Sequence, residues 1–161
     1  MKTQSGRLAA LTAIAMTFGA LPVHAARQQS PLVGTWVNTI EPPGGAPSSI
    51  AVSSFVAGGV VTGTPSEPPP PPLVRVGGVA GTWSDEGDGT YAFTIVAFTY
   101  DSSGTLTGTV KFNNKVMLLG NDRYEGISQY QVCDPQLVCP PPTANSAKLT
   151  GTRLSLQPVT E

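Results

Sequence analysis

The sequence predicts an all-β fold, a single antiparallel up-and-down β-barrel of about eight or nine strands. Short segments rich in Val, Thr, Ile, Phe and Tyr alternate with clusters of Gly, Pro, Asn and Asp, and no stretch shows a helical period. Gly-Thr pairs also recur seven times. Glycine inside a strand favours the bends and bulges that let a sheet curl and close, so a barrel is favoured over the alternative, a β-sandwich.

The chain begins with 25 residues that we expect to be a secretory signal peptide, ahead of a barrel domain at 26–161. A basic start is followed by the apolar residues 8–21 and by Val23-His24-Ala25, which fits a small-x-small cleavage site. The apolar run is short for a membrane span, and no later segment is long and apolar enough for a helical one. We therefore expect cleavage near Ala25, export to the periplasm or the medium, and a mature chain without a membrane span.

Nine segments of the mature chain are predicted to be strands. Each is a run of apolar, aromatic or Thr residues that is bounded by Gly, Pro, Asn, Asp or Ser. In chain order they are 32–39, 50–57, 59–64, 74–84, 90–100, 104–112, 115–119, 123–132 and 147–156.

Two neighbouring strands have the most informative patterns. Residues 104–112 alternate between apolar or Gly positions and Thr or Lys, which indicates one apolar and one hydroxyl-rich face. Residues 90–100 are apolar on both faces, so this strand needs protein on both sides, or a core on one side and a cavity on the other. Asp101-Ser102-Ser103-Gly104 is predicted to be the hairpin turn that joins them.

Two proline-rich segments interrupt the strands. Residues 41–47 are expected to form a loop between the first two strands, and 65–73 a stiff, extended loop, because proline fixes φ and has no N–H for a sheet ladder. A proline-rich run can also dock into an aromatic-lined groove, but a loop at the barrel rim is the favoured interpretation.

The composition argues against several kinds of catalytic site, metal site and partner. Cleavage removes His24, the single histidine of the chain, which excludes His-dependent nucleophilic catalysis and His-dependent metal sites. The mature chain has seven basic and ten acidic residues without a basic cluster, so nucleic acid is not an expected partner. The acidic segment 85–89 does not fit the twelve-residue calcium loop and is expected to be a solvated turn. No metal or other cofactor is expected.

The two cysteines are predicted to form a disulfide. Five residues lie between Cys133 and Cys139, and in an oxidising compartment such a pair closes a small loop. A loop of this size stabilises by roughly 2 kcal/mol, so the bond would fix a hairpin rather than hold the whole fold. A reactive pair is the alternative, but the spacing is not Cys-x-x-Cys and no neighbouring base would activate a thiol.

Three short motifs carry a resemblance to a known family. Gly34-Thr35-Trp36 opens the first strand, Asp122 precedes Tyr124 with Arg123 between them, and Arg153 lies in the last strand. In this pattern the chain resembles the lipocalins and the wider calycin barrels. The resemblance implies that Trp36 packs at the closed end of the barrel and that Arg153 lies across it as a cation–π cap. Residues 81–108 are also similar to small exported bacterial proteins of unassigned function.

The barrel interior is the candidate site, and core packing is the alternative role for each residue in it. An inward Arg would be a costly buried charge and would indicate an anionic group on the ligand. Of the two tryptophans, which both follow Gly-Thr, Trp83 is the one predicted to touch a ligand. The candidate ligand-binding residues are Trp83, Phe93, Ile95, Phe98, Tyr124, Tyr130 and Arg123.

Three functions remain open at this point. The first is the binding of a small apolar or amphipathic molecule by the exported barrel, with a small hydrophobic molecule as the partner. The second is a His-independent barrel cyclase or isomerase, in which Tyr124, Glu125 or Tyr130 would point into a cavity with a perturbed ionisation. The third is an envelope or surface interaction protein with a filled barrel that acts through its proline-rich loops.

Overall fold

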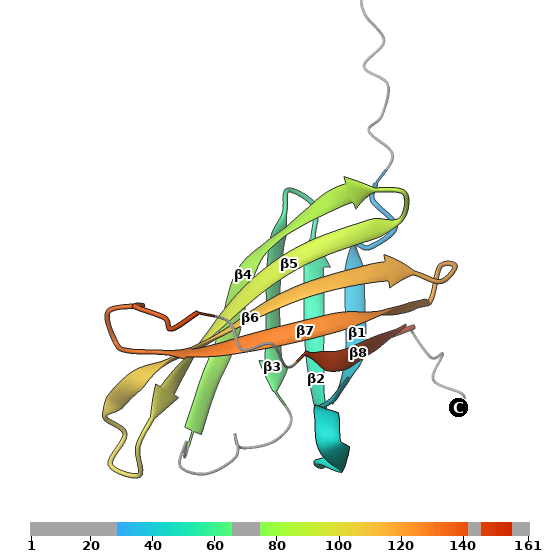
Figure 1. The fold of residues 1–161 in the computed structure, drawn as a ribbon. Coiled ribbons are helices and arrows are strands. Elements are labelled where there is room, and N and C mark those ends of the chain that lie inside the picture. Colours follow the sequence, from blue (N-terminus) through green and yellow to red (C-terminus); the bar gives the residue numbers. More distant parts are fainter. Residues whose placement is uncertain (1–28, 66–74, 142–145, 156–161) are drawn as a thin grey trace, which may run out of the picture.

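Eight antiparallel strands follow one another around a closed barrel, and the last strand pairs with the first (Figure 1). The computed structural model describes residues 29–65, 75–141 and 146–155. The predicted all-β, up-and-down barrel is thus confirmed. The strands are β1 Gly34–Glu41, β2 Ser49–Val56, β3 Val60–Pro65, β4 Arg75–Gly87, β5 Thr90–Tyr100, β6 Leu106–Leu118, β7 Arg123–Cys133 and β8 Ala147–Arg153.

One strand is longer than the sequence suggested. The segments 104–112 and 115–119 are parts of a single strand, β6, so the barrel has eight strands instead of nine. The prediction of a break at Asn113 and Asn114 was wrong, because both side chains are bonded to neighbouring strands. Asn113 Nδ2 donates to Gln131 Oε1 (3.0 Å) and Asn114 Nδ2 donates to the Phe93 carbonyl (3.2 Å).

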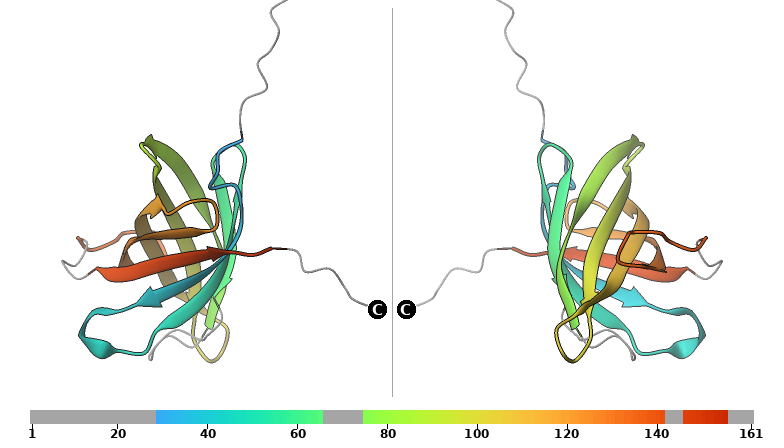
Figure 2. Two further views of the ribbon diagram at one scale, coloured as in Figure 1. Left: turned by 90° about the vertical axis from the view of Figure 1, so that its right-hand side faces the viewer. Right: turned by 90° about the vertical axis from the view of Figure 1, so that its left-hand side faces the viewer.

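The two ends of the barrel differ. We call one end the mouth: it holds the β1–β2, β3–β4, β5–β6 and β7–β8 connections, including a short 3₁₀ turn at Pro43–Gly45. We call the other the closed end: it holds the remaining hairpin turns and the chain that enters β1 and leaves β8. Figure 2 shows the β4–β5 turn of the closed end and the β1–β2 turn of the mouth on opposite sides of the molecule.

The predicted hairpin turn between β5 and β6 is confirmed. The Gly104 amide donates to the Asp101 carbonyl (3.0 Å), and Asp101 Oδ1 accepts the amides of Ser103 (2.8 Å) and Thr105 (2.9 Å). The Ser103 hydroxyl also donates to Asp101 Oδ1, and this hydrogen bond is the largest of those that lower the pKa of the Asp101 carboxyl. Most of the proline-rich loop predicted at 65–73 lies outside the described residues. In the described part of the chain, no helix is long and apolar enough to span a membrane.

The hydrophobic core gathers at the closed end. Its members come from the first residues of the odd strands, the last residues of the even strands, and the segment that enters β1. Ile40, Trp83, Ile95 and Leu118 pack against it while staying partly exposed. The buried residues of this core are Leu32, Trp36, Phe55, Val61, Tyr91, Phe93, Val116, Tyr124 and Leu149.

Glycines allow close approaches of side chains from other strands inside the barrel. A Cβ at Gly151 would collide with the ring of Tyr124, and one at Gly34 would collide with the guanidinium of Arg153. The strand register also shifts between Thr99 and Tyr100, opposite Gly108, whose φ of 159° is extended backbone. Glycine is therefore required at the first two positions because a side chain from another strand occupies the space of its Cβ.

The last strand leaves part of β7 without its second neighbour. Within the described residues β8 pairs with β7 only from Arg123 to Ser128. Beyond Ser128, β7 continues to Cys133 and is paired with β6 alone. The inner face of this β7 extension therefore lies at the mouth. On the side of β8 the barrel wall ends earlier, because β8 does not continue beside β7 after Ser128.

Candidate functional site

The closed end is capped by Trp36 and Arg153, as the resemblance implied. Trp36 is fully buried, and its Nε1 donates to the Leu32 carbonyl (2.9 Å). The ring of Tyr124 lies against it with 4.9 Å between the centroids. The guanidinium of Arg153 lies over its other side, 4.3 Å from the ring centroid. This is a cation–π contact, and it makes Trp36 part of the structure of the closed end.

Arg153 also holds the chain segments around the cap together. Its Nη1 donates to the Val33 carbonyl (2.8 Å) and its Nη2 to the Pro31 carbonyl, both ahead of β1. Its Nε donates to the carbonyl of Asn121 (2.8 Å), in the β6–β7 turn. Three of the five N–H groups of Arg153 are thus used within the protein, which gives this side chain a structural role.

Tyr124 belongs to a buried polar chain beside the cap. Its hydroxyl donates to Asn38 Oδ1, and Asn38 Nδ2 donates to Ser53 Oγ (2.8 Å). The missing Cβ of Gly151 leaves room for the Tyr124 ring to cross β8 and reach Asn38 on β1. Burial raises the pKa of the Tyr124 phenol above its usual range. Tyr124 is thus a neutral, fully bonded group inside the wall of the closed end.

Trp83 and Phe93 also lie at the closed end. Trp83 Nε1 donates to the Val56 carbonyl (2.9 Å), and its ring meets Phe55 edge-on at 6.3 Å between centroids. Phe55 in turn meets Phe93 edge-on at 5.0 Å. Both Gly-Thr-Trp motifs therefore place an indole N–H on a backbone carbonyl and an indole ring in the same end of the barrel. Contact between Trp83 and a ligand stays a prediction.

Two of the candidate residues lie on the outside of the barrel. Phe98 is 48% exposed, on the opposite face of β5 from the buried Ala97 and Thr99. Arg123 is exposed and forms an ion pair with Glu125 (3.5 Å) on the outer face of β7. Strand alternation explains both positions, because neighbours of inward residues point outward. The structure therefore separates Phe98 and Arg123 from the interior candidates, and Glu125 with them.

A row of apolar side chains crosses the inner wall toward the mouth. Ile95, Phe112 and Tyr130 are register partners on β5, β6 and β7. The rings of Phe112 and Tyr130 are 6.5 Å apart between centroids. Although this row faces inward, Tyr130 is 55% exposed, and Val132, two residues further along β7, is 47% exposed. We call Ile95, Phe112, Tyr130 and Val132 the mouth row. Ile95 and Phe112 are partly buried, and Tyr130 and Val132 are the part of this apolar inner wall that the described protein leaves open.

Two polar residues lie next to the mouth row on its closed-end side. Asn114 and Ser128 are register partners on β6 and β7, and they are 8% and 3% exposed. Sequence reasoning missed both: the strand 104–112 was ended before Asn114, and Ser128, inside the predicted strand 123–132, was not considered as a site residue. The alternation of β6, continued through Asn113 and Asn114, is the signal that could have placed Asn114 on the inner face.

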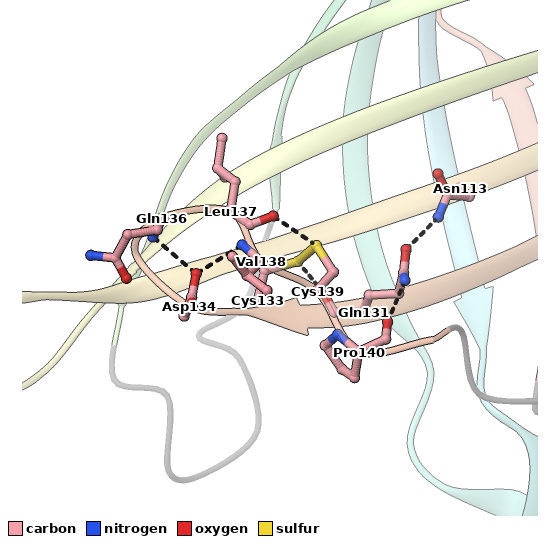
Figure 3. The surroundings of a disulfide bond; sticks show 9 residues. All are labelled: Asn113, Gln131, Cys133, Asp134, Gln136, Leu137, Val138, Cys139 and Pro140. Atoms are coloured by element: carbon pink, nitrogen blue, oxygen red, sulfur yellow. Dashed lines mark hydrogen bonds between the residues drawn. A yellow bond between two sulfur atoms is a disulfide. The ribbon is translucent and has the colours of Figure 1, made fainter.

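The predicted disulfide between Cys133 and Cys139 is confirmed, with an S–S distance of 2.00 Å (Figure 3). Asp134 Oδ1 accepts the backbone amides of Gln136 (3.0 Å) and Val138 (2.8 Å) inside the loop. Gln131 Nε2 donates to the Pro140 carbonyl (2.7 Å), which holds the chain beyond the loop against β7. The disulfide therefore closes a structured loop beside the mouth.

Three further points concern the acidic turn, metal ligands and a depression on the surface. The acidic segment 85–89 forms the β4–β5 turn, in which the Gly87 amide donates to Asp85 Oδ1 (2.9 Å). Among the described residues no group of three or more His, Cys, Asp or Glu could hold a metal ion. A shallow depression of about 150 Å³ is lined by Thr82, Trp83, Ser84, Ala92, Phe93 and Thr94. Because four of these residues have outward positions, the depression lies on the outer face of β4 and β5.

Comparisons with known proteins leave the family open. No protein-family model and no curated protein matches the sequence. Among solved structures, that of EF1p2_mFAP2b bound to DFHBI is similar at 17% sequence identity and a TM-score of 0.48, over 77% of this chain and 94% of that chain. The assignment of the fold therefore stands on the strand pairing of this chain.

Proposed function

We propose that the protein binds a small apolar or amphipathic molecule in the mouth of its barrel. The observation that carries the proposal is the mouth row, an apolar inner wall whose Tyr130 and Val132 are about half exposed. Exposed apolar surface is costly to maintain in water and commonly marks a binding site. The wall belongs to the inside of an eight-stranded barrel, a size that is either filled by side chains or holds one small ligand, and that is too narrow for a folded partner.

The filling of the closed end also supports this proposal. Trp36, Tyr124 and Arg153 fill and seal it with contacts among themselves. A ligand would therefore enter and leave through the mouth. The enzyme hypothesis has less support, because the Tyr124 hydroxyl is bonded to Asn38 and Glu125 lies outside, paired with Arg123.

A neutral solvatochromic dye, Nile red, tests the proposal. The wild-type protein is expected to show saturable binding, with increased and blue-shifted dye fluorescence. Tyr130→Ala is expected to weaken the affinity about five- to tenfold, because it removes an aromatic contact of about 1 kcal/mol. Ile127→Ala is the matched control: Ile127 is on the same strand and 49% exposed, but it faces outward.

Ile127→Ala should keep the wild-type affinity. Far-ultraviolet circular dichroism should show the same barrel for both variants, because both side chains are exposed and outside the buried core. Absence of saturable binding by the wild type, or equal affinity of the two variants, would contradict the proposal.

Export is the second part of the proposed function. It is supported by the signal-like residues 1–25 and by the disulfide between Cys133 and Cys139, which suits an oxidising compartment. Expression of the full chain in a secreting bacterial host should yield a protein whose intact mass corresponds to a start at Ala26 and to oxidised cysteines. An intact mass that includes residues 1–25 would refute the cleavage.

A further inference from the structure

The inner wall around the mouth row is uncharged. Among the side chains that the structure describes, the charged residues at inward register positions are Asp85 and Arg153. Both lie at the closed end, where Asp85 accepts the Gly87 amide and Arg153 covers Trp36. A charged ligand group in the mouth half would therefore meet no counterion from the wall, and burying an unpaired charge is far more costly than burying a bonded neutral group.

Next to Phe112 and Tyr130 the wall does offer hydrogen-bonding groups. Asn114 and Ser128 face each other across β6 and β7, one step from Phe112 and Tyr130. Asn114 uses its Nδ2 on the Phe93 carbonyl, which leaves its Oδ1 as an acceptor. No hydrogen bond between the Ser128 hydroxyl and another described residue is seen, and Ser128 is 3% exposed. Its oxygen is nevertheless not a sealed, unpaired atom, as Thr109 Oγ1 is among the described residues. The Ser128 hydroxyl is therefore open to a water or to a ligand group.

From this arrangement we propose that the site selects an uncharged amphipathic ligand: an apolar body with one hydroxyl group, as in a long-chain alcohol. The inference rests on the proposed function. The apolar body lies along the mouth row, and the polar group meets Asn114 and Ser128. A ligand hydroxyl can donate to Asn114 Oδ1 and accept from Ser128 Oγ, which satisfies all three groups. A carboxylate could accept from Ser128 but would face the Asn114 oxygen without a cation nearby.

A matched series of C12 compounds tests the preference: dodecanol, dodecanoate and dodecylammonium, each used to displace Nile red at pH 7.5 and below its micelle-forming concentration. Dodecanol is expected to bind at least about tenfold more tightly than either ion, because each ion must give up its hydration without a counterion. Equal or tighter binding of dodecanoate or dodecylammonium would overturn the inference. If Nile red itself does not bind, the proposed function fails and this inference falls with it.

A pair of serine variants tests the position of the polar group. Ser128→Ala is expected to lower the dodecanol affinity about fivefold, the effect of one lost hydrogen bond, while Nile red still binds. Ser54→Ala is the control, since Ser54 lies on the outer face and bonds Thr35 (3.0 Å). Ser128 bonds no described residue, so its removal should leave the barrel folded. Unchanged dodecanol affinity in Ser128→Ala would show that the ligand group lies elsewhere and would overturn the assignment.

Discussion

Arg153 connects parts of the chain that are far apart in sequence. Its side chain reaches the segment before β1, the β6–β7 turn and the face of Trp36. The likeness of Gly34-Thr35-Trp36 and Arg153 to the calycin pattern was enough to predict the cap. The inward or outward direction of Phe98 and Arg123 was not predictable in the same way, because it depends on the register that the sheet adopts.

Replacement of Arg153 should destabilise the folded protein. Arg153→Met is expected to lower the free energy of unfolding by about 3 kcal/mol, because it removes three hydrogen bonds from a charged donor as well as the cation–π contact. Urea denaturation of the purified protein measures this change. Arg123→Met is the control: Arg123 is exposed and paired only with Glu125, so its loss should stay within about 0.5 kcal/mol. Equal stability of the two variants would contradict the role given to Arg153.

At the scale of elements, most strands were visible in the sequence because their apolar and Thr-rich runs end at turn residues. The exception is β6. Asn113 and Asn114 suggested a turn, but their amides are used by Gln131, Thr94 and Phe93 on the two neighbouring strands. Such cross-strand bonds exist only after the sheet has formed, so local composition could not reveal them. The same error hid Asn114, one of the two polar residues of the candidate site.

The barrel is expected to fold without the disulfide between Cys133 and Cys139. Replacement of Cys133 and Cys139 by Ala is expected to lower the free energy of unfolding by about 2 kcal/mol and to keep the barrel, since the closed loop is short and Asp134 still bonds its backbone. Differential scanning calorimetry should show one cooperative transition at a lower temperature. Wild-type protein in a reducing agent should behave alike. Loss of the β-sheet circular dichroism at room temperature would contradict this expectation.

For the molecule as a whole, the all-β class and the up-and-down barrel followed from composition and spacing, with one strand too many among the predicted segments. What the sequence could not reveal was how the two ends come to differ. That difference arises because β8 is short and pairs with β7 only up to Ser128, which leaves Tyr130 and Val132 on open inner wall. It also arises because the residues before β1 fold over the closed end, where Leu32 is fully buried. Both depend on contacts between distant segments.

The cap has a consequence for the order in which the protein can fold. Arg153 bonds Val33 across 120 positions and Pro31 across 122, and β8 must pair with β1 before the barrel is closed. In a chain that emerges from the ribosome with its N-terminus first, the cation that covers Trp36 is absent until the last strand has been made. Contacts so distant in sequence also slow folding, because a long loop must close before they form. Late closure suits the export proposed above, in which a chain that is not yet folded is passed across a membrane and completes its barrel on the far side.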